Sequence, residues 1–181
     1  IMLMSERFPR LWRWGQGMFA IFPLLPTWGS VGLLVIAGVA IQKQPRSLLK
    51  RPLTWGLLVL SLWLILTSFT AEYPKPAWLG IANFIPFFIV FLGFNLLMET
   101  PRQLRRFAWL GIACALPVAI LGIGQITLSW TTPEALQPLF GWILAAEGNP
   151  TGRLASVFMY ANIAGAYFLV MFTLALGLWV E

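Results

Sequence analysis

The sequence predicts an all-α protein, a polytopic transmembrane helix bundle of five to six spans that includes a short N-terminal hairpin. Two observations predict this fold class. Of the 181 residues, 59% are hydrophobic and 10% are charged, whereas soluble domains carry about 25% charged residues. The apolar residues also gather in long runs separated by short polar links, and a membrane-spanning helix needs about 20 such residues. We expect residues 1–181 to form a single transmembrane domain.

The first apolar run, 16–41, is interrupted by turn-forming residues, namely Pro23, Pro26, Trp28 and Gly29. Basic residues stand on both sides of it: Arg7, Arg10 and Arg13 before, and Lys43, Arg46, Lys50 and Arg51 after. The positive-inside rule favours the cytoplasm for both groups. We therefore predict two short helices, 12–25 and 30–41, that form a hairpin with the N-terminus in the cytoplasm. The alternative is one span across 16–41.

Four further apolar runs predict full-length spans, at 53–70, 78–98, 107–130 and after residue 153. The basic links 42–52 and 99–106 are expected in the cytoplasm, and the link 71–77 on the outer side. Tryptophans fall at the ends of these runs, as in an aromatic belt: Trp55, Trp78, Trp109, Trp130 and Trp179. The pattern indicates an integral membrane protein.

The segment 131–152 is the longest one predicted on the outer side. Its apolar residues recur at i, i+3, i+4, i+7 and i+8, at Leu136, Leu139, Phe140, Ile143 and Leu144. This spacing predicts an amphipathic helix. At this length we expect the helix to rest on the membrane surface.

Arg153 stands directly before the last apolar run, on the predicted outer face. Its guanidinium is a planar fork of donors suited to phosphate; the alternative is that it extends to lipid headgroups and marks the helix end. A continuous helix from residue 153 would place Ser156 and Tyr160 on the face of Arg153, and Asn162 on the opposite face. We predict that Arg153, Ser156 and Tyr160 bind substrate and that Asn162 holds the helix against a neighbour.

Several function classes are disfavoured by what the chain lacks. It contains no histidine and no aspartate, and its six glutamates lie in loops or at the termini. The spans therefore hold no carboxylate for a proton relay, and no paired acids for a metal. We predict no catalytic residue, no metal and no cofactor in these residues. The net charge of +6 sits in topology signals between the spans, so we expect no nucleic-acid partner.

The run RLASVFMYANIAGAYFL (153–169) resembles the segment that opens the conserved region of the O-antigen ligase and polymerase superfamily. That superfamily includes cyanobacterial relatives labelled inorganic-carbon transporters. The pattern, roughly R-x-x-G/S-x-F-x-x-x-N-x-x-A-x-Y-L, is met by Arg153, Ser156, Phe158, Asn162 and Tyr167, with Gly165 at the small position. The family often has Asn-Pro just before the matched asparagine, and this chain has Tyr160-Ala161 there.

The resemblance implies a metal-independent glycosyltransferase of a bacterial, possibly cyanobacterial, cytoplasmic or thylakoid membrane. Such enzymes transfer a glycan from a polyprenyl-pyrophosphate carrier on the outer face, and the arginine matching Arg153 contacts the carrier's phosphates. A histidine and a second arginine in a later outer loop complete the family's site. We therefore expect the chain to be the N-terminal half of a larger protein, inactive alone, with membrane lipids and the lipid-linked glycan carrier as partners.

Two other hypotheses stay open. One is a transporter-like membrane protein of the inorganic-carbon type. The other is a non-catalytic subunit of a larger membrane complex.

Overall fold

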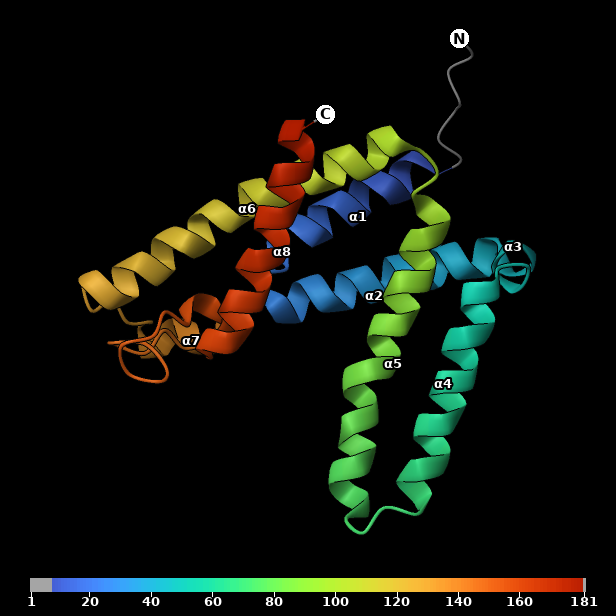
Figure 1. The fold of residues 1–181 in the computed structure, drawn as a ribbon, viewed down its shortest axis with the longest axis horizontal. Helices are drawn as coiled ribbons and strands as arrows, with labels where there is room; N and C mark the ends of the chain where they lie inside the picture. The colour runs from blue at the N-terminus through green and yellow to red at the C-terminus, as the bar shows by residue number, and fades with distance from the viewer. Residues whose placement is uncertain (1–7, 181) are drawn as a thin grey trace. The chain divides into compact units, whose positions relative to one another are not determined.

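The computed structural model describes residues 8–180, and its regular elements are helices (Figure 1). The predicted all-α class is therefore confirmed. The α-helices are α1 (Pro9–Ile21), α2 (Pro26–Lys43), α3 (Pro45–Leu49), α4 (Pro52–Phe69), α5 (Pro74–Leu97), α6 (Pro101–Thr127), α7 (Gln137–Phe140) and α8 (Ala161–Val180). Two short 3-10 helices, η1 (Glu134–Leu136) and η2 (Ser156–Phe158), complete the described elements.

Proline marks the start of six of these α-helices, α1 to α6. Proline fits the first helical turn because its missing N–H would have no helical partner there and its φ is already helical. The start of α6 carries a second signal. Thr100 and Gln103 form a capping box, in which each side chain accepts from the other residue's backbone N–H. The starts of these helices are thus determined by residues at the start itself.

The N-terminal apolar run forms two helices, as predicted, but the break lies at residues 22–25 and not at 26–29, because Pro26 starts α2 and Trp28 and Gly29 lie inside that helix. Met18 of α1 packs against Gly32 of α2, where a Cβ would collide with the methionine side chain. At the other end, Lys43 Nζ lies 5.1 Å from the centre of the Phe8 ring, a cation–π contact. The two ends of the run are therefore neighbours in space, as a hairpin requires. The cytoplasmic position of the N-terminus stays a prediction, and Arg7 lies outside the described residues.

Four helices among residues 8–180 are long and apolar enough to cross a membrane: α4, α5, α6 and α8. The chain is thus an integral membrane protein, but the expected five to six spans are too many for the described residues. The hairpin explains the difference. Helix α1 has only 13 residues, and α2 begins with Pro26 and Thr27 and ends with Gln42 and Lys43.

The chain divides into two compact units. The first contains residues 33–99 and the described residues up to Arg13. Helices α4 and α5 run side by side as a hairpin in it (Figure 1). Leu48, Leu92 and Leu96 form a buried cluster. Arg51 donates hydrogen bonds to the backbone oxygen of Asn95, at 2.8 Å, and to its side-chain oxygen.

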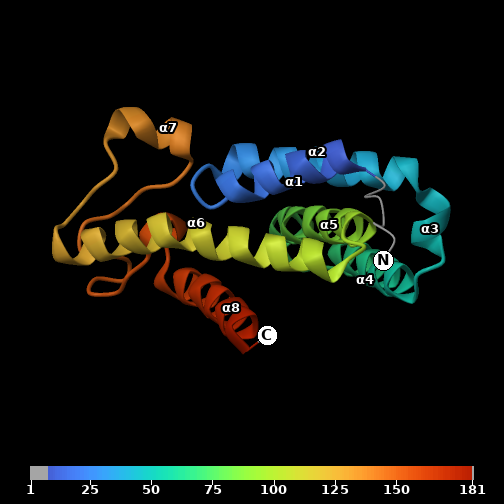
Figure 2. The same cartoon turned by 90° about the horizontal axis from the view of Figure 1, so that it is seen from above.

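The second unit contains residues 14–32 and 100–180. Helix α8 crosses α6 in Figure 1 and slants away below it in Figure 2, and Gly111 of α6 lies next to Met171 of α8. A buried cluster of Val118, Trp142, Leu144 and Val157 joins α6 to the segment that precedes α8. The sites of interest lie in this unit.

The predicted surface helix in 131–152 is wrong beyond Phe140. Helix α7 ends there, because Gly141 adopts a left-handed conformation with φ of 73°. The following residues form no helix; among them Trp142 and Leu144 are buried and Ile143 is exposed. Thr132 holds Leu144 through two hydrogen bonds, one to each of its backbone polar groups. These tertiary contacts stabilise a non-helical backbone here, although the spacing of the apolar residues favours a helix.

Candidate functional site

Gln125 organises the segment between α6 and α8. It lies near the end of α6 and is 1% exposed. Its Nε2 donates to the carbonyl oxygen of Ala145 at 2.8 Å, and its Oε1 accepts from the backbone N–H of Ala155 at 3.1 Å and of Ser156 at 2.9 Å. One amide thus satisfies three backbone groups that no helix satisfies. Sequence reasoning missed Gln125, although an amide inside an apolar run requires partners.

Ser156 adds a second attachment to α6. It is fully buried, and its Oγ donates to the carbonyl oxygen of Val118 at 2.6 Å. Its backbone has φ of 50°, a left-handed conformation that is uncommon for residues other than glycine. The hydroxyl predicted to bind substrate therefore lies inside the protein and already has a partner. What it contributes is the attachment of the loop to α6.

Arg153 lies on a tight loop formed by residues 147–153. Its backbone N–H donates to the carbonyl oxygen of Pro150 at 2.9 Å, and its own carbonyl accepts from Asn149 N–H at 3.2 Å. Gly152 N–H closes the loop on the Glu147 carbonyl at 2.8 Å. Gly148 has φ of 86°, and a Cβ there would collide with the Arg153 carbonyl. The backbone of Arg153 is therefore held firmly in place.

The Arg153 side chain, by contrast, is exposed. Among residues 8–180 its guanidinium forms neither a hydrogen bond nor an ion pair, even with Glu147 of the same loop. All the donors of its planar fork are free for an external anion. The loop thus presents an unpaired cationic side chain from a backbone position that hydrogen bonds fix.

Asn149 brings the start of α8 to this loop. Its Nδ2 donates to the carbonyl oxygen of Met159 at 2.7 Å, and its carbonyl accepts from Ala161 N–H at 2.9 Å. Tyr160, the residue before α8, is 49% exposed. The first turn of α8 contains no acidic residue, so the positive end of its helix dipole is not offset there. Arg153, Tyr160 and the start of α8 thus gather around Asn149.

The prediction of one continuous helix from residue 153 is wrong. Helix α8 begins at Ala161, and Met159 is left-handed with φ of 60°. The backbone N–H groups of residues 155 and 156 donate to Gln125 Oε1, and these hydrogen bonds compete with helical ones there. Arg153, Ser156 and Tyr160 therefore share no helical face, although Asn149 bonds to Arg153 and to the residues on either side of Tyr160. Their role in substrate binding stays a prediction.

Asn162 lies in the first turn of α8 and is exposed. Its side-chain amide bonds to no residue within 8–180. The neighbour that it was predicted to hold is thus not among these residues, and its structural role stays a prediction. The asparagine that does hold the start of α8 is Asn149.

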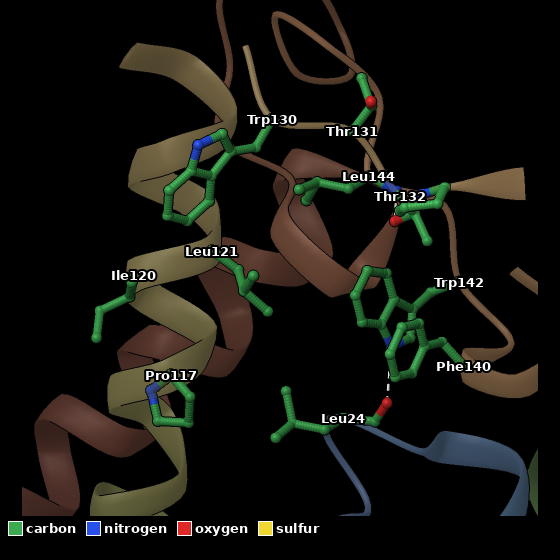
Figure 3. Close-up of a pocket in the computed structure, with 11 residues that line it drawn as sticks. Leu24, Pro117, Ile120, Leu121, Trp130, Thr131, Thr132, Phe140, Trp142 and Leu144 are labelled. Carbon is green, nitrogen blue, oxygen red and sulfur yellow. Dashed lines mark hydrogen bonds between the residues drawn. The ribbon is translucent and has the colours of Figure 1, made fainter. Parts of the chain in front are cut away.

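A pocket of about 510 Å³ lies beside Trp142, and we call it the Trp142 pocket (Figure 3). The indole N–H of Trp142 donates to the carbonyl oxygen of Leu24, in the α1–α2 turn, at 2.8 Å. Leu121 of α6 faces the stacked rings of Phe140 and Trp142. The pocket is lined by Leu24, Pro117, Ile120, Leu121, Trp130, Thr131, Thr132, Pro133, Phe140, Trp142 and Leu144. Sequence reasoning did not find it, because its walls come from three separate segments.

Metal-ligating side chains do not gather in groups of three or more within residues 8–180. The expectation of no metal and no cofactor stays a prediction. In comparisons with known proteins, no protein-family model matches the chain, and no curated protein or solved structure is significantly similar to it. The resemblance of residues 153–169 therefore rests on those residues alone.

Proposed function

We propose that the chain belongs to a membrane glycosyltransferase of the O-antigen ligase type, in which Arg153 binds the pyrophosphate of a polyprenyl-linked glycan. One observation carries the proposal most: Arg153 is exposed and unpaired within residues 8–180, on a loop whose backbone is fixed by hydrogen bonds. The resemblance of residues 153–169 supplies the substrate class. We place the loop on the outer face of a bacterial membrane, and the N-terminus in the cytoplasm.

The chemistry of the loop supports an anionic ligand. A guanidinium binds two phosphate oxygens at once through parallel hydrogen bonds. Because the Arg153 backbone is already fixed, less conformational entropy is lost when the anion binds. Tyr160 is exposed beside the same asparagine and can add a hydroxyl donor. The α8 N-terminus adds the positive end of a helix dipole.

In this proposal Arg153 also acts during transfer. As the bond between the glycan and the pyrophosphate breaks, its electron pair goes to the pyrophosphate, whose negative charge grows. A positioned guanidinium stabilises that charge in the transition state. The acceptor hydroxyl forms the new glycosidic bond, and its proton goes to a base outside residues 1–181. Activity then requires the whole protein, whereas carrier binding is testable on this chain.

The test is binding of farnesyl pyrophosphate, a short polyprenyl pyrophosphate, to the chain in lipid nanodiscs. We expect Arg153→Ala to weaken binding about tenfold or more, which corresponds to about 1.4 kcal/mol, and Arg153→Lys to weaken it less. Lys75→Ala is the control, because Lys75 is an exposed cation in another link predicted on the outer side. Equal affinity of Arg153→Ala and the unmodified chain would refute the assignment.

The second candidate is a non-catalytic subunit of a larger membrane complex. The exposed amide of Asn162, which has no partner within residues 8–180, favours it. A polar side chain in a transmembrane helix gains about 1 kcal/mol by bonding to a neighbouring helix. If a partner helix binds there, Asn162→Leu should release a co-purifying membrane protein while Arg153→Ala retains it.

A further inference from the structure

We propose that the Trp142 pocket is a binding site for one hydrocarbon chain of a membrane lipid. The pocket volume of about 510 Å³ falls in the range of ligand sites, about 300–1,000 Å³. All of its walls belong to the unit formed by residues 14–32 and 100–180. Its occupancy does not require Arg153 to bind phosphate, so the two proposals stand or fall separately.

The lining chemistry selects an apolar ligand. The two buried polar side chains of the pocket already have partners: Trp142 Nε1 donates to the Leu24 carbonyl, and Thr132 Oγ1 accepts from Leu144 N–H at 2.9 Å. A polar ligand would lose its hydrogen bonds to water on entering the pocket, and the lining offers few hydrogen-bonding groups to replace them. A hydrocarbon chain has no such cost, and each CH₂ that leaves water gains free energy.

The pocket also has a closed floor and an open side. Trp142 and Leu144, at its floor, are 6% and 3% exposed, whereas Ile120 is 58% and Trp130 is 41% exposed. Trp130 and Thr131 follow the end of α6, a helix of 27 residues. Such a helix is about 40 Å long, so it crosses a hydrocarbon core of about 30 Å and brings its ends to the interface. Ile120 lies well inside α6, so the open side faces hydrocarbon, and a chain can enter from the bilayer.

The test is photo-labelling of the chain in nanodiscs that contain a phospholipid with a diazirine at the end of one acyl chain. Exposed residues such as Trp63 react in any case and serve as the positive control. Leu96 is 2% exposed in a cluster without such a pocket and should stay unlabelled. Trp142 and Leu144 become labelled only if a chain enters the pocket. Absence of label on both, with Trp63 labelled, would overturn the proposal.

Two variants narrow the result. Ile120→Trp adds an indole at the open side, and Ile123→Trp is its control, because Ile123 is 56% exposed on the same helix and lies outside the lining. We expect Ile120→Trp to lower the labelling of Trp142 about tenfold and Ile123→Trp to leave it unchanged. Leu121→Trp, which fills the interior, should lower it as well. Equal labelling in the two pocket variants and the control would also overturn the proposal.

A competition experiment identifies which lipid supplies the hydrocarbon chain in the pocket. It is needed because a phospholipid acyl chain and a polyprenyl chain are both apolar and could both fit. Unlabelled polyprenyl phosphate is added in one arm, and unlabelled phospholipid in the same amount in the other. Selective loss of label from Trp142 with polyprenyl phosphate assigns the pocket to an isoprenoid chain. Equal loss in both arms assigns it to the acyl chains of bulk lipid. Either result supports a hydrocarbon chain in the pocket.

Discussion

Gln125 Oε1 accepts a hydrogen bond from Ser156 N–H at 2.9 Å, across 31 residues of sequence. This bond, with the two others of the same amide, attaches the segment before α8 to the end of α6. The position of Arg153 therefore depends on a side chain whose hydrogen bonds go to other residues.

Replacing Gln125 by leucine should loosen the segment around Arg153. The change leaves two buried N–H groups, at residues 155 and 156, and the Ala145 carbonyl without their partner. We expect the free energy of unfolding to fall by about 2–4 kcal/mol. Amide exchange at residues 153–160 should accelerate. Gln137→Leu is the control, because the Gln137 amide makes one bond, at 3.3 Å, to Thr132. Unchanged melting temperature and exchange in Gln125→Leu would contradict this interpretation.

Gly148 and Gly152 allow the loop geometry itself to be tested. Both have positive φ, but a Cβ at Gly148 would meet the Arg153 carbonyl, whereas a Cβ at Gly152 would meet open space. We expect Gly148→Ala to displace Arg153 and to weaken farnesyl pyrophosphate binding strongly. Gly152→Ala adds only the backbone strain, about 1 kcal/mol. Equal affinities of the two variants would show that the loop geometry does not set the binding.

Close contact between α2 and α5 gives a stability prediction in the other unit. A Cβ at Gly93 would collide with the backbone and side chain of Ala37. Gly93→Ala should therefore lower the free energy of unfolding by about 1–3 kcal/mol through overpacking. Gly80→Ala on the same helix faces open space and should be neutral or stabilising by up to about 1 kcal/mol. Thermal unfolding of both variants in one detergent checks the difference in sign.

The hydroxyl of Tyr167 is buried without a hydrogen-bond partner within residues 8–180. A buried polar group without a partner opposes folding. We expect Tyr167→Phe to leave the melting temperature unchanged or to raise it, by an amount equivalent to about 0.5–1 kcal/mol. Tyr160→Phe, at an exposed site, should have no effect on stability. A clear loss of stability in Tyr167→Phe would mean that the hydroxyl has a partner in the folded protein.

The helices were predictable where their signals are local. Proline starts α4, α5 and α6 one, four and six residues before the predicted limits, and Pro23 and Pro26 mark the break in the N-terminal hairpin. Both kinds of signal act through φ and the missing N–H of a single residue. They need no knowledge of the rest of the fold.

The segment before α8 was not predictable in this way. Ile143 and Leu144 fit a helical stripe by spacing, yet Ile143 is exposed and Leu144 is buried in a non-helical segment, where Thr132 holds Leu144. The helix expected from Arg153 onward fails for the same kind of reason, since Gln125 and Asn149 bind its backbone. Hydrogen bonds between residues far apart in the sequence produce no periodic pattern of residue types, so the sequence alone does not reveal them. Arg153 was predictable as a candidate binding residue, but the loop and the hydrogen bonds that hold its backbone were not.

The prolines that start α4, α5 and α6 limit how these helices can respond to the membrane around them. A proline in the first turn disfavours extension of the helix toward its N-terminus, because the residue before proline is biased toward an extended conformation. The lengths of these spans are therefore fixed at their N-terminal ends. In a bilayer of different thickness the hydrophobic mismatch must be met by helix tilt or by deformation of the lipid. These three helices should thus respond to a change in bilayer thickness by changing their tilt and not their length.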